Sequence, residues 1–503
     1  MAILEALVEL DRDRPGLADR LTVALRAAIV DGRLAPGSRL PSSRDLATDL
    51  RLSRGVVVEA YEQLVAEGRL VARRGSGTTV STGQHGTAAV STGQHRLATA
   101  GGTAGATAGA TAGKAVRPSR EPAAPARNGD GRRVTDPAGV PTGRGGVLPL
   151  RPGVPDPGLF PRTAWRRAYE RALDRAGAAD LDYGDPAGAP RLRAELAGYL
   201  GRVRAARVRP LDLLATTGAA QAFGLLAGAL RSVGVDAVGL EDPGSEGIRA
   251  HLVAHGLRLV PIPVDDGGLD VAALARTGLR AVLVTPAHQF PTGVVLAPDR
   301  RAALLDWTRR VDGLVIEDDY DAEFRYDRDP VGCLQGLAPD LVAHIGSASK
   351  ALAPALRLGW LAVPPGLRSA VLAAKAAADL GGPVLEQLAF AELLAGGGYD
   401  RHLRRLRRVH RQRRDAVVAA VRRHLPAARI SGVAAGLHLV VELPEHIDDV
   451  PLADAAHRAG LGPAPLSRLR LAPGGPPGLV LGYATHPPDV LGRAVATLAE
   501  LIV

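Results

Sequence analysis

The sequence predicts a protein in two parts, with a small helical unit preceding a larger α/β unit built on a mostly parallel sheet. Two observations support this. Residues 17–67 carry apolar residues at helical spacing, interrupted by turn signals. From about residue 147, short apolar runs alternate with helical patterns, which is typical of a parallel sheet with helices on both faces. A stretch of low complexity separates the two parts.

The composition narrows the class of protein. The chain has 503 residues, a formal net charge of +10 and only 3% aromatic residues, so its core must be built from Ala, Leu and Val. The single cysteine, Cys333, excludes a disulfide framework and a cysteine metal cluster, and we predict no metal site. Glu5 and Glu9 interrupt the N-terminus, which argues against a secretory signal. The uncharged run 213–230 contains glycine and polar residues, which favours a buried helix over a membrane span. We therefore expect a cytoplasmic protein with no membrane association.

Residues 81–146 differ from the rest of the chain. The segment STGQH occurs at 81–85 and again at 91–95, and the whole stretch contains no Ile, Phe, Tyr, Trp or Met. Such a segment cannot bury enough apolar surface to offset the entropy lost on ordering. We predict a disordered linker over 81–146, between domains at 1–80 and 147–503.

The first domain has the pattern of a winged helix-turn-helix. One helix is predicted over Leu17–Val30, a second begins after Ser42, which has capping-box spacing to Asp45, and a third begins after Ser53. A strand-like run and a hairpin tip follow at 70–78. In this layout arginines and helix N-termini contact phosphates while the last helix reads base edges. A helical protein-interaction module is the alternative interpretation.

Residues 32–80, GRLAPGSRLPSSRDLATDLRLSRGVVVEAYEQLVAEGRLVARRGSGTTV, resemble the DNA-binding domain of GntR-type regulators. The resemblance implies double-stranded DNA, a promoter or operator, as the partner. Gly55 and Val56 depart from the small polar residues usual at the tip of the recognition helix. The residues implied to contact DNA are Arg44, Ser53, Arg54, Arg74 and Gly75.

Five short apolar runs predict strands of the second domain. Ligands of such sheets bind beyond the carboxyl ends of the strands, so the residues that follow each run are candidates for a site. The runs are 237–240, 281–285, 313–317, 341–345 and 358–363.

Polar side chains follow two of these runs. Asp318 and Tyr320 come after the third, and Ser347, Ser349 and Lys350 come after the fourth. Lysine, of which the chain has only three, can form an imine, whereas arginine cannot. A carboxylate can keep a pyridine nitrogen protonated, and a phenol can hydrogen-bond a ring oxygen. This set of groups suits pyridoxal 5'-phosphate.

Other groups suit the phosphate of that cofactor. Arg357, with the two serines, can hold an anion through charge-assisted hydrogen bonds. Residues 216–221 open a predicted helix whose free backbone N–H groups, at Ala219 and Ala220, can also bind phosphate.

These residues resemble those of fold type I aminotransferases, and more narrowly of MocR-type regulators, which join a GntR-type domain to an aminotransferase-like domain. The resemblance implies Lys350 as the imine lysine, Asp318 as the partner of the pyridine nitrogen, Tyr320 as that of the ring oxygen, and a smaller C-terminal α+β subdomain. It also implies a homodimer in which Tyr183 reaches the phosphate of the partner subunit. The motifs are RPGVPDPGLFP, YGDPAGAPRLRAELAGYL, EDPGSEGIRA, TPAHQFPTG, IEDDYDAEFRY and IGSASKALAPALRLGWLAVP.

Three positions depart from the aminotransferase pattern. Ser245 replaces the aromatic residue that usually stacks on the cofactor ring. Ala219 and Ala220 replace polar side chains of the phosphate loop, which leaves only backbone donors. Phe290 replaces the asparagine of ordinary aminotransferases, a change familiar in the regulators.

Further residues leave alternatives open. His288 suits a supporting position near the cofactor better than that of a catalytic base. Arg468 and Arg470 are weak candidates for binding a substrate carboxylate. The segment Arg401–Arg414 holds eight arginines in 14 residues, which favours a solvated helix over a second nucleic-acid surface.

The predicted function is that of a transcription regulator that senses an amino compound, or the cofactor itself, through Lys350, with at most half a transamination. A working aminotransferase that carries a DNA-binding fusion is the main alternative. A binding module that has lost its cofactor is the third possibility, because Ser245 weakens the expected stacking.

Overall fold

The computed structural model describes residues 17–30, 33–50, 52–73, 77–81, 147–326 and 332–502. Almost all of the predicted linker, from residue 82 onward, lies outside the described residues, as do Arg74 and Gly75 of the predicted hairpin tip.

The N-terminal domain is a winged helix-turn-helix. Ser42 accepts a hydrogen bond from the Asp45 N–H and Ser53 accepts one from the Val56 N–H, so both predicted caps start their helices. The two strands pair antiparallel, and leucines from all parts of the domain form one core. The elements are α1 (Leu17–Val30), α2 (Ser43–Asp49), α3 (Arg54–Ala66), β1 (Leu70–Arg73) and β2 (Gly77–Val80).

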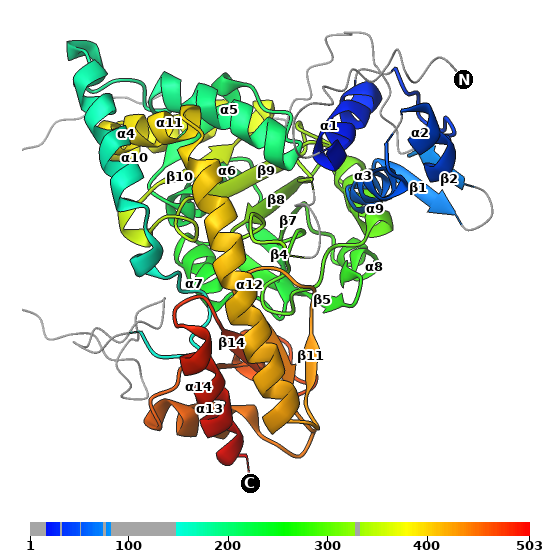
Figure 1. Ribbon diagram of the computed structural model, residues 1–503. Coiled ribbons are helices and arrows are strands. Elements are labelled where there is room, and N and C mark those ends of the chain that lie inside the picture. Colours follow the sequence, from blue (N-terminus) through cyan, green and yellow to red (C-terminus); the bar gives the residue numbers. More distant parts are fainter. Residues whose placement is uncertain are drawn as a thin grey trace, which may run out of the picture.

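The second domain alternates strands and helices as predicted, and Figure 1 shows its helices packed around a central sheet. In chain order the elements of this domain are α4 (Arg162–Arg175), α5 (Pro190–Arg204), β3 (Leu213–Thr216), α6 (Ala219–Ser232), β4 (Ala237–Asp242), α7 (Glu246–Ala254), β5 (Arg258–Asp265), β6 (Gly268–Leu269), α8 (Val271–Ala275), β7 (Ala281–Val284), α9 (Pro298–Arg310), β8 (Leu314–Asp319), β9 (Val342–Ser347), β10 (Gly359–Ala362), α10 (Arg368–Asp379) and α11 (Val384–Ala395).

The central sheet has the order β3-β10-β9-β8-β7-β4-β5-β6. Strands β5, β4, β7, β8 and β9 are parallel, which confirms the mostly parallel sheet, whereas β10 runs antiparallel to both of its neighbours. All five predicted strands are present. Their carboxyl ends therefore meet at one edge, where the predicted site residues follow β8 and β9.

One prediction about this domain is wrong. The run 213–230 does not form a single buried helix, because Leu213–Thr216 form strand β3 and only the part from Ala219 is helical, in α6. The break lies at Gly218, whose φ of 95° is a left-handed conformation that glycine adopts without strain. The break also places the N-terminus of α6 at the edge of the sheet.

A smaller C-terminal subdomain follows, as the resemblance implied. Its four strands form an antiparallel sheet in the order β11-β12-β14-β13. Figure 1 shows the long helix α12 running from the main domain into this subdomain. The elements are α12 (Gly398–His424), β11 (Arg429–Ser431), β12 (His438–Glu442), α13 (Asp449–Arg458), β13 (Ala464–Pro465), β14 (Gly478–Gly482) and α14 (Pro488–Glu500).

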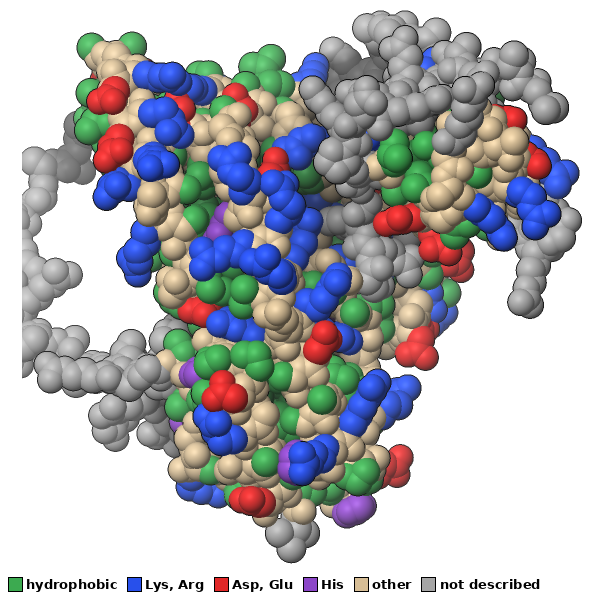
Figure 2. Space-filling model, in the orientation of Figure 1, with side chains coloured by type: hydrophobic (Ala, Val, Ile, Leu, Met, Phe, Trp, Pro, Cys, Tyr) green, Lys and Arg blue, Asp and Glu red, His purple; other side chains and the backbone are tan. Residues whose placement is uncertain are grey.

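The arginine-rich segment lies on α12. Arg401, Arg404, Arg405 and Arg408 are exposed, whereas Leu403 is buried on the opposite side of the helix. Figure 2 shows the blue side chains of basic residues spread along this helix. The segment is thus an amphipathic helix with a solvated basic face. No helix in the described part of the chain is both long enough and apolar enough to cross a membrane.

Candidate functional site

A cavity of about 320 Å³ lies at the carboxyl ends of β4, β7, β8 and β9. The N-terminus of α6 and the start of β12 in the C-terminal subdomain also line it. Eight of the ten residues that we predicted for the cofactor line this cavity: Ala219, Ala220, Asp318, Tyr320, Ser347, Ser349, Lys350 and Arg357.

Lys350 follows β9 and extends its amine into the cavity. The amine donates a hydrogen bond to the carbonyl oxygen of Gly153, which also lines the cavity. Burial lowers the pKa of Lys350, although Asp321 and Asp318 oppose this effect. A lowered pKa increases the fraction of neutral amine, which is the nucleophilic form that attacks an aldehyde.

Successive side chains of a strand point to opposite faces of the sheet, so only one of three consecutive carboxylates in β8 points into the cavity. Asp318 faces the cavity, while Glu317 and Asp319 on either side of it face the opposite surface of the sheet. There Glu317 accepts hydrogen bonds from two backbone N–H groups, and Asp319 accepts one from Arg204 at 2.7 Å. These partners hold β8 rigidly behind the cavity.

The carboxyl group of Asp318 is only 6% exposed, and no hydrogen-bond partner for it is found within the described ranges. Burial, reinforced by the nearby charges of Asp319 and Asp321, raises its pKa to about 7. A buried carboxylate without a donor is unfavourable, and a protonated ring nitrogen in the cavity would remedy this.

Tyr320 is held from behind by a histidine. Its hydroxyl lies 3.1 Å from Nδ1 of His288, and the same nitrogen lies 3.0 Å from Oδ2 of Asp321. His288 is 2% exposed and does not itself line the cavity. The geometry therefore places His288 where it orients the phenol.

The part of the cavity beside Arg357 and the N-terminus of α6 is suited to an anion. Arg357 donates a hydrogen bond to the carbonyl oxygen of Thr217, and its guanidinium covers Gly218. The φ of 95° at Gly218 favours glycine in this loop, and a Cβ there would lie 2.7 Å from Arg357 Nη2. The N-terminus of α6, beginning at Ala219, adds backbone N–H groups.

A polar cluster that the sequence did not predict lies beside the cavity. Glu241 lines the cavity and accepts hydrogen bonds from the Thr285 N–H and hydroxyl at 3.0 and 2.5 Å, and from Gln289 at 3.4 Å. Burial raises the pKa of Glu241 to about 7. His438 also lines the cavity, and it comes from the C-terminal subdomain. Glu241 and Gln289 stand within two of the quoted motifs, EDPGSEGIRA and TPAHQFPTG, whereas no signal pointed to His438.

Other predicted residues take different positions. Ser245 lines the cavity and caps α7 by accepting a hydrogen bond from the Ile248 N–H, so it has a structural reason to be serine. Arg468 pairs with Asp454 and Arg470 donates to the carbonyl oxygen of Pro476, and neither lines the cavity. Tyr183 is 80% exposed and lies away from the cavity of its own chain.

Among the residues that the structure describes, two buried groups of side chains have atoms that a metal ion could use. One contains His288 and Asp321, which already contact each other and Tyr320. The other contains Glu317, whose two oxygens accept hydrogen bonds from the backbone of Leu334 and Gln335. The absence of a metal stays a prediction.

Three predicted DNA contacts lie on the surface of the N-terminal domain. Arg44 is exposed in the first turn of α2, and Ser53 and Arg54 are exposed at the start of α3. The N-terminal ends of both helices thus present a hydroxyl and two guanidinium groups to the solvent.

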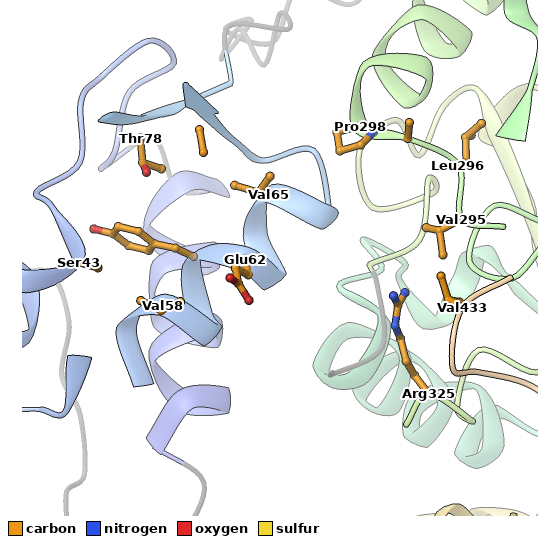
Figure 3. A pocket seen from close by; sticks show the side chains of 13 residues that line it. Ser43, Val58, Glu62, Val65, Thr78, Val295, Leu296, Pro298, Arg325 and Val433 are labelled. Carbon is orange, nitrogen blue, oxygen red and sulfur yellow. The ribbon is translucent and has the colours of Figure 1, made fainter. Parts of the chain in front are cut away.

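A groove of about 620 Å³ separates the two domains. Figure 3 shows Val58, Glu62 and Val65 of α3 on one side, and Val295, Leu296 and Pro298 on the other. Beside this groove the domains touch, because the guanidinium of Arg69 lies 3.5 Å from the carbonyl oxygen of Gly336. Helix α3, the recognition helix of the helix-turn-helix, thus faces the second domain across this groove.

Comparison with known proteins agrees with both domains. Residues 17–80 match the model of bacterial regulatory proteins of the gntR family, and residues 154–458 match aminotransferase class I and II. The chain is 34% identical to the HTH-type pyridoxine biosynthesis transcriptional regulator PdxR of Corynebacterium glutamicum, over 96% of this chain and 95% of that protein. It is 32% identical to the probable rhizopine catabolism regulatory protein MocR of Rhizobium meliloti, over 98% and 95%.

The chain belongs to the MocR-type regulators. It is a transcription regulator with a GntR DNA-binding domain and a fold type I aminotransferase-like domain that depends on pyridoxal 5'-phosphate. Among solved structures, it is similar to the Thermus thermophilus α-aminoadipate aminotransferase LysN in complex with N-(5'-phosphopyridoxyl)-L-leucine. The identity is 29% and the TM-score 0.64, over 71% of this chain and 92% of that one.

The cavity of this MocR-type regulator fits the cofactor. Asp318 lacks a donor that a protonated ring nitrogen could supply, and the loop at Gly218 forms a cradle that a Cβ would fill. Arg357 stands over that cradle. The cofactor supplies an aldehyde that reacts with amines and a ring that accepts electrons.

The raised pKa of Asp318 makes the stability of the cofactor-free protein depend on pH. The pKa of this carboxyl rises from 3.8 to about 7 on folding. Its contribution to the stability of the folded protein is therefore fully present below pH 3.8 and is lost as the pH rises through 7. We expect cofactor-free Asp318→Asn to be more stable than the wild type above pH 7, by about 4 kcal/mol at most, because the pKa rises from 3.8 to about 7 and each pKa unit corresponds to about 1.4 kcal/mol. Urea unfolding at pH 5 and pH 8 checks this. A gain that is equal at both pH values would contradict it.

Proposed function

We propose that occupancy of Lys350 by pyridoxal 5'-phosphate controls the DNA affinity of this regulator, so that the vitamer itself is the signal. The observation that carries the proposal is the path of residues 285–298. Thr285 and Phe290 line the cofactor cavity, and Val295–Pro298 line the groove against α3. One short segment therefore lines both the cofactor cavity and the groove that α3 borders.

The segment is stiff enough to pass on a displacement. Gln289 N–H donates to the carbonyl oxygen of Val294 at 2.8 Å, and Leu296 N–H donates to that of Pro286 at 3.0 Å. These bonds close the segment on itself. Glu241 holds its beginning through Thr285. A change in the cavity at Phe290 would thus move Val295–Pro298 relative to the DNA-binding domain.

The roles of the cavity residues follow from their positions. Lys350 would carry the cofactor covalently, Asp318 would keep the ring nitrogen protonated, and Tyr320 would hydrogen-bond the ring oxygen with His288 behind it. The phosphate would be held by the remaining predicted residues: Arg357, Ser347, Ser349, Ala219 and Ala220.

Two observations favour the vitamer over an amino acid as the signal. Arg468 and Arg470, the candidates for a substrate carboxylate, are engaged with Asp454 and Pro476 outside the cavity. The relative from Corynebacterium glutamicum is named for the regulation of pyridoxine biosynthesis. An amine that reacts once with the cofactor remains the alternative effector.

We further propose that the regulator works in the cytoplasm as a homodimer, in which Tyr183 completes the phosphate site of the partner subunit. Its 80% exposure leaves the phenol available to a second chain. Removing one hydrogen bond to a charged group costs about 1.5–3 kcal/mol. We expect Tyr183→Phe to weaken cofactor binding about tenfold or more while the subunits remain associated, as measured by fluorescence titration and sedimentation. An unchanged affinity would contradict this role.

The proposed function is tested by fluorescence anisotropy of a labelled DNA fragment from the adjacent intergenic region. The full-length protein is freed of cofactor and titrated onto the fragment alone, with pyridoxal 5'-phosphate, and with a panel of amino acids on the loaded protein. We expect the vitamer alone to shift the dissociation constant. A shift that requires an amine would make the amine the effector, and steady turnover of amino donors would support a working aminotransferase instead.

A further inference from the structure

A buried lysine outside the cofactor cavity has a role that the site does not explain. Lys375 on α10 is 0% exposed, although lysine is rare in this chain and seldom buried in proteins. Its amine lies 2.8 Å from each carboxylate oxygen of Asp379, one turn later in the same helix. It does not line the cofactor cavity, so it does not compete with Lys350.

Asp379 connects this ion pair to the phosphate end of the cavity. Its Oδ2 accepts a hydrogen bond of 2.5 Å from Nε2 of Gln221 in the first turn of α6. Oε1 of Gln221 in turn accepts a hydrogen bond of 2.9 Å from the backbone N–H of Thr217. The carbonyl oxygen of Thr217 accepts the hydrogen bond from Arg357. A continuous chain of contacts therefore runs from Lys375 to the loop at Gly218.

The negative charge on Asp379 determines which groups donate and which accept along this series of hydrogen bonds. Burial alone would raise its pKa, but the hydrogen bonds from Lys375 and Gln221 hold it below the ordinary value. An ionised Asp379 accepts hydrogen bonds only, so it fixes the amide of Gln221 with its oxygen toward Thr217. This orientation holds the Thr216–Thr217 peptide, which directly precedes Gly218 and the N-terminus of α6.

The same carboxylate also accepts a hydrogen bond from a residue that lies beside the segment of Tyr183. Oδ1 of Asp379 accepts a hydrogen bond of 3.0 Å from the N–H of Gly381, whose φ is 134°. A Cβ at Gly381 would lie 3.4 Å from the carbonyl oxygen of Asp185 and 3.5 Å from that of Tyr183. Asp379 thus supports two elements that serve the phosphate, one in its own chain and one proposed to serve the partner.

We propose that Lys375 and Asp379 are positioning residues for the cofactor phosphate, which they reach through Gln221 and the Thr217–Gly218 loop. The inference rests on the proposed phosphate site. It assigns to Lys375 a part in selecting the phosphorylated vitamer over pyridoxal, which lacks the phosphate. Supporting residues of this kind typically contribute about ten- to a hundredfold to the affinity of the site that they orient.

The test compares two vitamers on the full-length protein. Dissociation constants for pyridoxal 5'-phosphate and for pyridoxal are measured by equilibrium dialysis on the cofactor-free wild type, Lys375→Met and Gln221→Ala. We expect both variants to weaken binding of the phosphorylated vitamer about ten- to a hundredfold and to leave pyridoxal binding unchanged. The ³¹P resonance of the bound phosphate should shift in both variants. Lys375→Arg should restore part of the affinity, because it restores a cation beside Asp379.

The controls separate positioning from stability. Arg493→Met breaks an ion pair with Asp489 that has the same four-residue spacing on α14, far along the chain from the cavity, and it should change neither constant. Gln221→Ala decides the question if Lys375→Met unfolds, because it cuts the chain of contacts while leaving the ion pair in place. Equal losses for both vitamers, or no loss for either, would overturn the inference. A wild type that prefers the phosphorylated vitamer but shows no response in DNA affinity would refute the proposed function and leave this inference standing.

Discussion

Lys350→Ala is expected to abolish covalent retention of pyridoxal 5'-phosphate and to make DNA affinity indifferent to the vitamer. Lysine alone among the cavity-lining side chains offers an amine for the aldehyde, and its lowered pKa favours the reactive form. The visible absorption band of the lysine-bound cofactor should disappear, and the anisotropy titration of the DNA fragment should give one dissociation constant with and without the vitamer.

The matched control for this variant is Lys114→Ala, which removes a lysine that precedes the second domain and leaves Lys350 in place. It should retain the absorption band and the response of DNA affinity. Reduction with borohydride followed by peptide mass analysis should find the pyridoxyl group on the peptide that contains residue 350. A Lys350→Ala protein that still shows a vitamer-dependent DNA affinity would contradict the sensing role of this residue.

Replacing Arg44 and Arg54 together by alanine is expected to weaken DNA binding by about two to four powers of ten. Each arginine that contacts DNA contributes about 1–3 kcal/mol, and each phosphate contact also steepens the dependence on salt by about one unit. Both residues are exposed at helix N-termini of the N-terminal domain. Anisotropy titrations at several salt concentrations measure both effects, while the absorption band of the cofactor should be unchanged.

Arg408→Ala is the control for general basic charge, because Arg408 is exposed on α12 in the other domain. It should leave DNA affinity unchanged if α12 is only a solvated helix. A loss as large as that of the double variant would show that α12 contributes a second nucleic-acid surface. It would then contradict the assignment of DNA binding to the N-terminal domain alone.

The architecture could be predicted because local signals agreed with it. Ser42 and Ser53 cap the helices that they were expected to cap, and the five apolar runs of the second domain all form strands of its sheet. The run 213–230 was misread because uniform apolar character does not distinguish a buried strand from a buried helix. Only the conformation of Gly218 shows where the strand ends.

The candidate site could be predicted in part. Asp318 stands at the carboxyl end of one strand and Lys350 follows the neighbouring strand, and the topology of the sheet brings them to one cavity. Glu241 is also at a strand end, but a single carboxylate there gives no sign of its buried partners. His438 and Asp379 could not be predicted, because they reach the site from the C-terminal subdomain and from α10 through contacts that only the tertiary packing creates.

We propose that occupancy of Lys350 changes DNA binding, so cofactor binding and the change in DNA affinity should follow the same titration curve. Cofactor-free protein bound to its DNA fragment is titrated with pyridoxal 5'-phosphate while the absorption band and the anisotropy are recorded on the same sample. We expect both signals to change with the same midpoint. A band that saturates while the anisotropy stays constant would contradict it.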